Sequence, residues 1–159
     1  MRADEGALLR DLRLRALAEA PRAFFTTLDA DAAEPPERWE RLAAASEEGA
    51  TDVVWVVVRD DRWVAMAGGG LDAGRPGSAI LWGMWVEPTA RRCGLGARLV
   101  GAVAAWARAL GASRLELAVS EDSDAAAALY RALGFAPTGE RRRMASDPTR
   151  SGIFLARPL

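Results

Sequence analysis

An apolar segment, a glycine-containing loop and an amphipathic segment follow one another between Ser78 and Leu110, and this order constrains the fold more than any other feature. Ser78–Val86 is apolar on both faces, which is typical of a central strand that is covered on both sides. The loop after it ends in Gly94-Leu95-Gly96. Helical spacing then relates the apolar residues Leu95, Leu99, Val103, Trp106 and Leu110. A strand, a glycine loop and a helix in this order predict an α/β protein.

The N-terminal half changes from a helical period to a strand period. Apolar spacing predicts a helix at Asp4–Ala20 and a second one that Pro35-Pro36 opens and Glu47, Glu48 and Gly49 end, with a loop at Arg22–Glu34 between them. A dense β-branched run and a second apolar run predict strands at Val53–Arg59 and Arg62–Gly70. Two helices followed by two strands therefore precede the strand, glycine loop and helix between Ser78 and Leu110.

The C-terminal third continues the alternation. Arg114–Val119 has the period of a strand, and Ser123–Leu133 has the pattern of a short helix. The tail Gly139–Leu159 predicts two strands around a turn at Asp147-Pro148. Because no linker or repeat divides the chain, we expect residues 1–159 to form a single α/β domain with a mixed sheet.

Composition excludes several classes of chemistry. All 21 basic residues are arginine, and the absence of histidine excludes a histidine base, nucleophile partner or metal ligand. The only cysteine, Cys93, can form neither an internal disulfide nor a thiolate zinc site, so we expect no metal. A net charge of -1 argues against nucleic acid as a partner. No segment is apolar enough for a signal peptide or a membrane span, so we expect no membrane association and a cytoplasmic location.

The glycine loop has the composition of an anion site. Glycines allow backbone N–H groups to approach a ligand, and the helix N-terminus adds a partial positive charge, which together suit a diphosphate. A P-loop is excluded because the chain has no lysine, and the dinucleotide fingerprint is excluded because Leu99 replaces its third glycine. Two glycines at a helix start also occur for packing alone, and that alternative stays open.

Two ordered motifs resemble those of the GNAT (Gcn5-related) N-acetyltransferase family. The family's Gln/Arg-x-x-Gly-x-Gly/Ala core is matched by Arg91, Gly94 and Gly96. About 30 residues downstream, the second block is matched by Ala126, Leu129, Tyr130, Gly134 and Phe135, and the end of the chain from Phe154 to Leu159 resembles the family's last strand. The resemblance therefore extends over nearly the whole chain.

This resemblance implies a fold and a cofactor site. The fold would be a mixed, mostly antiparallel sheet flanked by helices, with a central splay between Ser78–Val86 and Arg114–Val119. Acetyl-CoA would insert its pantetheine into that splay and pair with backbone groups around Met84, Trp85 and Val86. Its pyrophosphate would be held by backbone N–H groups of the loop residues Arg91, Arg92, Cys93, Gly94, Leu95, Gly96 and Ala97. The acceptor amine would then attack the thioester directly.

The second motif implies a catalytic acid. Tyr130 matches the family's tyrosine that protonates the departing thiolate, although it could instead pack in the core beside Leu129 and Leu133. Ser123 stands where the family has asparagine, and its hydroxyl could bond pantetheine or simply cap the helix. Cys93 occupies a variable position of the loop, where we expect no covalent role.

The acceptor site and the general base are less constrained. In this family the acceptor pocket is commonly built from the loop between the first two helices and from late strands, which makes Phe24, Phe25 and Thr26 candidates. Glu87 and Glu116 are candidate bases, but a water chain or an acidic residue of the first loop would serve as well. The arginine-rich segment from Arg141 to Arg150 could attract an acidic acceptor or the CoA 3′-phosphate, or it could be a solvated strand edge.

We therefore predict an enzyme that moves acetyl from acetyl-CoA to the primary amine of a small molecule. The alternatives are a protein N-terminal acetyltransferase and a non-catalytic CoA-binding regulatory domain. The retained Tyr130 favours the enzyme, whereas the lack of an obvious base favours the regulatory domain. The terminal strands offer an edge for a homodimer, and the sequence leaves the oligomeric state open.

Overall fold

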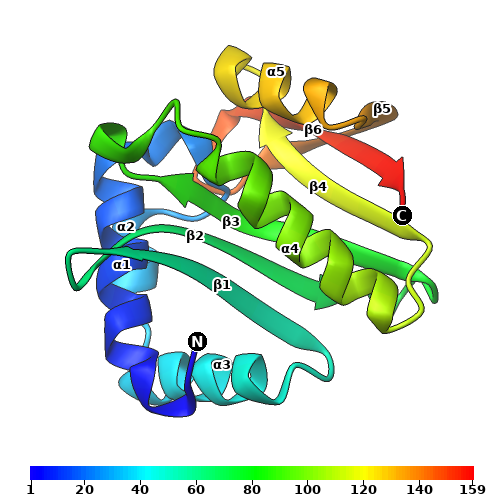
Figure 1. Cartoon of the computed structure of the whole chain (residues 1–159). Helices are drawn as coiled ribbons and strands as arrows, with labels where there is room; N and C mark the ends of the chain where they lie inside the picture. The colour runs from blue at the N-terminus through cyan, green and yellow to red at the C-terminus, as the bar shows by residue number, and fades with distance from the viewer.

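Six strands form one sheet in the computed structural model, which describes residues 1–159 (Figure 1). The strands are β1 (Asp52–Arg59), β2 (Arg62–Leu71), β3 (Ser78–Val86), β4 (Arg114–Ser120), β5 (Ala136–Met144) and β6 (Asp147–Pro158). They lie in the order β1-β2-β3-β4-β6-β5. Only β3 and β4 are parallel neighbours, and every other pair is antiparallel. The predicted mixed, mostly antiparallel sheet is therefore confirmed.

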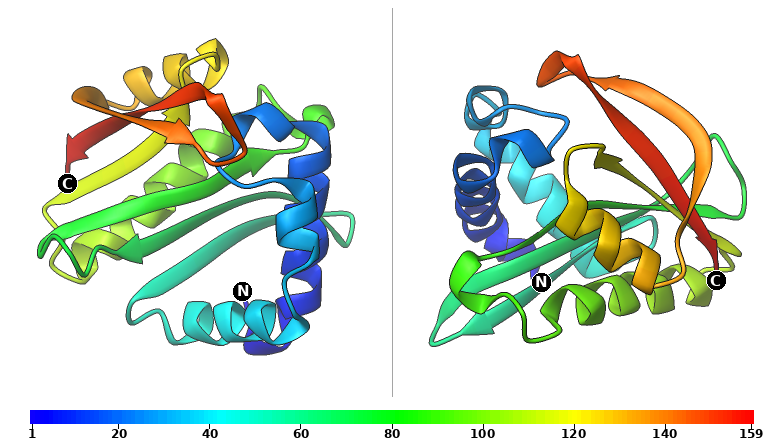
Figure 2. Two further views of the ribbon diagram at one scale, coloured as in Figure 1. Left: turned by 180° about the vertical axis from the view of Figure 1, so that it is seen from behind. Right: turned by 90° about the horizontal axis from the view of Figure 1, so that it is seen from above.

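Helices cover both faces of this sheet (Figure 2). They are α1 (Gly6–Glu19), α2 (Leu28–Ala32), α3 (Pro36–Glu48), α4 (Leu95–Ala109) and α5 (Asp124–Ala132), with single 3₁₀ turns at Ala3–Glu5, Pro21–Ala23 and Pro88–Ala90. One core lies between α1, α3 and the sheet, with Leu12 and Trp39 buried in it. A larger core lies between α4, α5 and the other face, around Val103 and Leu117. None of the helices is both long and apolar enough to cross a membrane.

Three local predictions were wrong in part. The first helix begins at Gly6 rather than Asp4, after a 3₁₀ turn. It passes so close to α3 that a Cβ at Gly6 would lie 2.9 Å from the backbone nitrogen of Glu40. The segment Arg22–Glu34, expected as a loop, contains α2, because the Thr27 hydroxyl accepts a hydrogen bond from the N–H of Ala30 and caps a short helix.

The turn of the C-terminal hairpin lies upstream of Asp147-Pro148, between Met144 and Asp147. Fully buried Met144 ends β5, and Pro148 lies within β6. The pairing of β6 with β4 begins only at Gly152, so no neighbouring strand on that side requires the N–H that proline lacks. The hairpin also starts earlier than predicted, at Ala136 rather than at Gly139, shortly after α5 ends at Ala132.

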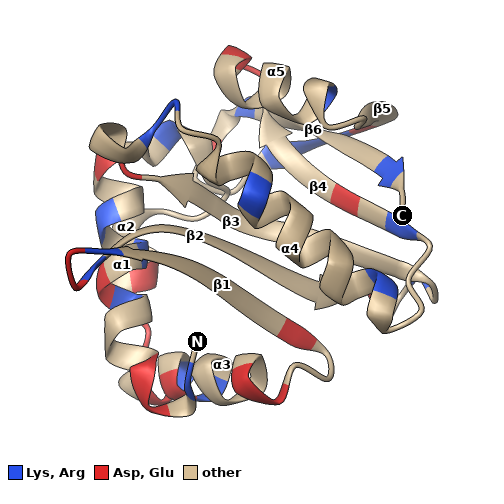
Figure 3. Cartoon of the chain, in the orientation of Figure 1, with Lys and Arg blue, Asp and Glu red and all other residues tan.

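The predicted splay lies at the centre of the sheet. Pairing between β3 and β4 is limited to Ser78–Leu81 with Arg114–Leu117, and beyond it the two strands diverge (Figure 1). The register between β2 and β3 shifts at this point, and Gly83 has a φ of +63°, so the bulge bends β3 where the divergence begins. Charged residues gather at the helices, turns and outer strands, and β2 and β3 carry few of them (Figure 3). The gap therefore opens in an apolar part of the sheet.

Candidate active site

A cleft of about 490 Å³ occupies the gap between β3 and β4. Met84, Leu117 and Tyr130 line it, and all three pack against the core on the α4 and α5 side. Phe25 and Thr26, from the segment between α1 and α2, line it as well. The cleft therefore connects the α5 side of the sheet with the loop that follows α1. We call the part around Gly83, Met84 and Tyr130 the reaction end.

The start of α4 presents free backbone donors beside the gap. The six N–H groups from Arg92 to Ala97 have no hydrogen-bond partner within the chain. Gly94 has a φ of +79°, and a Cβ built there would meet no atom within 4 Å. Unpaired N–H groups at a helix N-terminus form an anion site, which fits the diphosphate of a CoA molecule. The N–H of Arg91, also predicted to belong to this site, instead donates to the carbonyl oxygen of Pro88 at 3.3 Å.

The side chains of the loop serve its structure. Arg91 donates from Nη2 to Glu19 at 2.7 Å and from Nε to the carbonyl oxygen of Val86 at 2.8 Å. The same carboxylate oxygen of Glu19 accepts from the indole N–H of Trp85 at 2.9 Å. The Cys93 thiol donates to the carbonyl oxygen of Ala90 at 2.9 Å. These contacts tie the loop to α1 and β3, so its backbone donors are held in place.

Tyr130 packs in the core and also lines the cleft. The residue is 6% exposed and packs its ring edge-on against Phe135, with 5.7 Å between centroids. It also lines the cleft, and its hydroxyl forms no hydrogen bond within the chain. Burial raises the pKa of the phenol well above its usual value, because the charged form would lose its hydration. The side chain therefore stays protonated and presents a proton donor in the cleft.

Ser123 and Glu87 differ in their placement. Ser123 precedes α5 and lines the cleft, and its side chain makes no capping hydrogen bond, so its hydroxyl is available to a ligand. Glu87 does not line the cleft. Its carboxylate pairs with Arg62 at 2.7 Å and with Arg15 at 3.9 Å. The structure thus places one of the two candidate bases outside the site.

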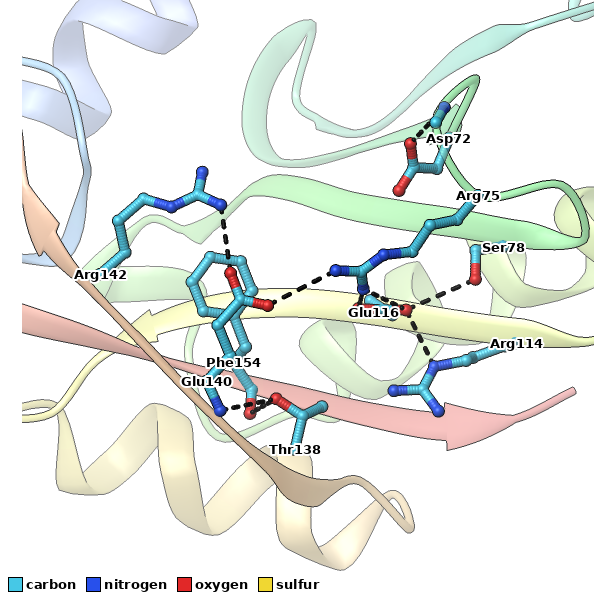
Figure 4. A network of polar contacts seen from close by, with 10 residues as sticks. Asp72, Arg75, Ser78, Arg114, Glu116, Thr138, Glu140, Arg142 and Phe154 are labelled. Atoms are coloured by element: carbon cyan, nitrogen blue, oxygen red, sulfur yellow. Dashed lines mark hydrogen bonds and ion pairs between the residues drawn. The ribbon is translucent and has the colours of Figure 1, made fainter.

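The other candidate base, Glu116, lies at the far end of the cleft in a network of ion pairs (Figure 4). Its buried carboxylate accepts from Arg75 at 3.0 Å, from Arg114 at 2.9 Å and from Ser78 at 3.4 Å. The contact with Glu116 raises the pKa of Arg75. With both oxygens engaged, Glu116 has little capacity to accept a proton from an amine.

The same network continues to β5. Arg75 reaches Glu140 at 3.6 Å, and Glu140 also pairs with Arg142 at 3.1 Å. We call these residues, together with Glu116 and Arg114, the far-end network. The triple arginine had pointed to Arg142, but Arg75 and Glu140 were missed because they come from a turn and a strand edge far apart in the sequence. No local pattern could have indicated their contact.

Phe24, Phe25 and Thr26 all line the cleft, as the resemblance implied for an acceptor site. The ring of Phe25 lies against β6 at Gly152, where a Cβ would overlap it. Thr26 donates its hydroxyl proton to Asp31 at 2.9 Å. Arg13 of α1 lines the cleft too and was not predicted. No group of three acidic or thiol side chains is placed to hold a metal ion.

A mixed sheet that divides beside a helix start with free backbone donors, with a tyrosine in the gap, is the arrangement that the family resemblance implied. The chain belongs to the acetyltransferase (GNAT) family, whose family model matches residues 14–135. No curated protein sequence matches it.

Solved structures of the same fold cover the whole chain. A GNAT-family acetyltransferase from Streptococcus pneumoniae superposes with a TM-score of 0.81 at 20% identity, covering 100% of this chain and 96% of that one. The yncA protein of Salmonella typhimurium, solved with its cofactor acetyl-CoA, gives 0.80 at 16% identity, covering 100% and 91%. A ribosomal-protein-alanine N-acetyltransferase from Brucella melitensis gives 0.76 at 20% identity, covering 100% and 97%. At these identities the likeness establishes the fold.

Proposed function

We propose that this protein is an N-acetyltransferase that transfers acetyl from acetyl-CoA to the primary amine of a small molecule. The observation that carries the proposal is the cleft itself, which brings Tyr130 and Ser123 on one side together with Phe25 and Thr26 on the other. Two substrates that approach from opposite sides of the sheet would meet in this gap without a covalent acyl-enzyme.

The chain's backbone would hold the donor. The free N–H groups from Arg92 to Ala97 suit the diphosphate, and β3 is unpaired on its β4 side beyond Leu81, so it can bond an extended pantetheine. Acetyl-CoA supplies an activated thioester. Backbone N–H groups around Met84 would polarise its carbonyl oxygen as an oxyanion site does.

Tyr130 would donate a proton to the sulfur as the thiolate departs. A phenol with a raised pKa is a weak acid toward a thiolate in water. Inside the cleft the same desolvation raises the pKa of the thiol as well, which makes the transfer less unfavourable. Burial therefore acts on both partners of the proton transfer.

The far-end network favours a small acceptor over a protein N-terminus. Arg75 crosses from the β2–β3 turn to Glu116 on β4 and Glu140 on β5, so ion pairs bridge this end of the cleft and would narrow the space for a polypeptide (Figure 4). None of the three carboxylates that line the cleft, Asp72, Glu116 and Glu140, belongs to the reaction end. The base that accepts the amine proton is therefore not assigned to a side chain.

The test measures free-thiol release from acetyl-CoA against amino acids, polyamines, aminoglycosides and short peptides, with acetyl-CoA binding followed by calorimetry. Thiol release that depends on one class of small amine is the expected result. Release with peptides alone would select the protein N-terminal acetyltransferase. Tight binding without turnover on any amine would select the regulatory domain, and absence of binding would contradict the cofactor site.

A further inference from the structure

We infer that Arg13 binds the carboxylate of the acceptor, and that the acceptor is an α-amino acid with an apolar side chain. The inference rests on the proposed function and names the substrate class of the same cleft. Nothing in the sequence motifs pointed to Arg13, which lies on α1, distant in sequence from every other part of the cleft except the segment after α1.

Two contacts hold the guanidinium of Arg13 in position, and a third fixes its partner Asp31. Its Nε donates to Oδ2 of Asp31 at 2.8 Å, and Oδ1 of Asp31 accepts from the hydroxyl of Thr26 at 2.9 Å. The guanidinium carbon lies 4.5 Å from the centroid of the Phe24 ring. The side chain is 13% exposed. An arginine held in this way retains little conformational freedom to lose when a ligand binds.

The far edge of the same guanidinium has no partner. Nη1 and Nη2 donate no hydrogen bond within the chain, and Nη1 is buried. A buried, unpaired donor destabilises the folded state unless a ligand or water satisfies it. Nη1 lies beside the β3 bulge, since a Cβ at Gly83 would be 3.7 Å from it, and both residues line the cleft. The free edge therefore lies beside Gly83, at the reaction end.

The distribution of charge selects a carboxylate for this edge. Arg13 is the only charged residue that lines the reaction end, and its counter-ion Asp31 does not line the cleft. The arginines at the other end, Arg75 and Arg142, differ in that their carboxylate partners Glu116 and Glu140 line the cleft as well. A guanidinium edge with two parallel N–H groups matches a carboxylate in geometry and in charge. An amine that carries a carboxylate on the same carbon would be oriented with its nitrogen beside Met84.

The walls between the two ends are apolar. Ile80, which is 40% exposed, lies on β3 with Trp82, and Phe25 and Phe154 complete this part of the cleft. Such surfaces gain free energy when an apolar side chain displaces water from them. A site for a carboxylate at one end and an apolar wall beyond it suit leucine, methionine or phenylalanine better than a polyamine or an aminoglycoside.

The experiment compares matched acceptors that differ only in the carboxylate: L-phenylalanine with phenethylamine, and L-leucine with 3-methylbutylamine. We measure kcat/KM for each and express it per unprotonated amine, which removes the difference in amine pKa. The expected result is a preference of about tenfold or more for the amino acid, mostly in KM. Efficient acetylation of both members of a pair, without preference, would overturn the inference.

Variants assign that preference to Arg13. Arg13→Met keeps the length of the side chain and should raise KM for L-phenylalanine about tenfold or more, with little change for phenethylamine. Arg13→Lys should recover part of the preference, because it restores the charge without the planar edge. Arg10→Met is the matched control, since Arg10 also joins α1 to α2, through a 3.0 Å hydrogen bond to the carbonyl oxygen of Ala32, but does not line the cleft.

The outcomes separate this inference from the proposed function. An equal loss for both members of a pair in Arg13→Met would assign Arg13 a purely structural role and overturn the inference. A preference that survives Arg13→Met would do the same. Absence of acetyl transfer to every amine by the wild-type protein would instead contradict the proposed function, before Arg13 is considered.

Discussion

The start of α4 and the far-end network differ in whether their polar groups have partners within the chain. At the start of α4, six backbone N–H groups have no partner within the chain. At the far end, Glu116 and Glu140 each pair with two arginines. The first region leaves its hydrogen-bonding capacity free, whereas the second uses it to join β4, β5 and the β2–β3 turn. We therefore base the proposed cofactor site on free polar groups and not on the density of charge.

The strongest test of this contrast introduces a carboxylate of the chain itself beside the free N–H groups of α4. We expect Gly96→Glu to weaken acetyl-CoA binding at least about 100-fold, because a carboxylate at a helix start competes for the same N–H groups. The new side chain would also begin 3.1 Å from Cδ2 of Leu129. Calorimetric titration with acetyl-CoA measures the effect.

Gly101→Glu provides the control for that substitution. Gly101 lies on the same helix and is exposed, and no atom lies within 4 Å of the point that its Cβ would occupy. The variant should bind acetyl-CoA like the wild type and be slightly more stable, because glutamate favours the helix more than glycine does. Tight binding by Gly96→Glu would show that the free donors do not form the cofactor site.

Tyr130→Phe tests the proton donor in the gap. We expect kcat to fall about 100-fold, since general acid catalysis typically contributes 10²–10⁴-fold. The dissociation constant of acetyl-CoA should change little, because the hydroxyl makes no hydrogen bond that organises the site. Steady-state kinetics and calorimetry on the same preparation separate the two effects. An unchanged kcat would remove the acid role and leave Tyr130 as a core residue.

Substitutions in the far-end network should lower the stability of the protein and leave cofactor binding unchanged. Glu116→Gln removes the buried charge between Arg75 and Arg114, and because both arginines are about half exposed we expect a loss of only about 1–2 kcal/mol in the free energy of unfolding. Urea denaturation measures it, with acetyl-CoA affinity as the control. A large loss of that affinity would mean that the two regions are coupled and that the contrast drawn between them is wrong.

The smallest effect concerns alkaline pH. Burial raises the pKa of Tyr130 in the folded state, so its contribution to stability is fully present below the unfolded pKa of about 10 and is lost as pH rises toward the folded pKa. The chain has no lysine and no other tyrosine, and a Cys93→Ser background removes the thiol. In that background we expect the free energy of unfolding to fall by about 1 kcal/mol by pH 11.

Adding Tyr130→Phe to that background should abolish the alkaline loss, because phenylalanine does not ionise. Urea denaturation at pH 8, 10 and 11 provides the comparison. An equal loss of stability with and without the tyrosine hydroxyl would show that another group titrates, and that the phenol is less buried than the structure indicates.

Much of the fold was predictable because the spacing of apolar residues within each segment indicates a helix or a strand. β3, the loop to Gly96 and α4 were located from their own residues, whereas the splay was implied only by the family resemblance. The errors lie where a contact distant in sequence decides the local structure. Helix α2 forms within an expected loop, and Asp31 of that helix is the partner of Arg13 on α1. The final turn lies before Asp147 and not at Asp147-Pro148, because β6 pairs with β5 from Asp147 onward.

By itself, the sequence determined the part of the protein that we propose to bind the cofactor. The backbone donors lie at one helix start and Tyr130 lies on one short helix, and each is encoded by consecutive residues. The tertiary structure alone decided the rest of the cleft, which Arg13 lines from α1, Arg75 from a turn and Glu140 from β5. Their ion pairs depend on how distant segments pack, and a side chain's partners cannot be read from its neighbours in the chain.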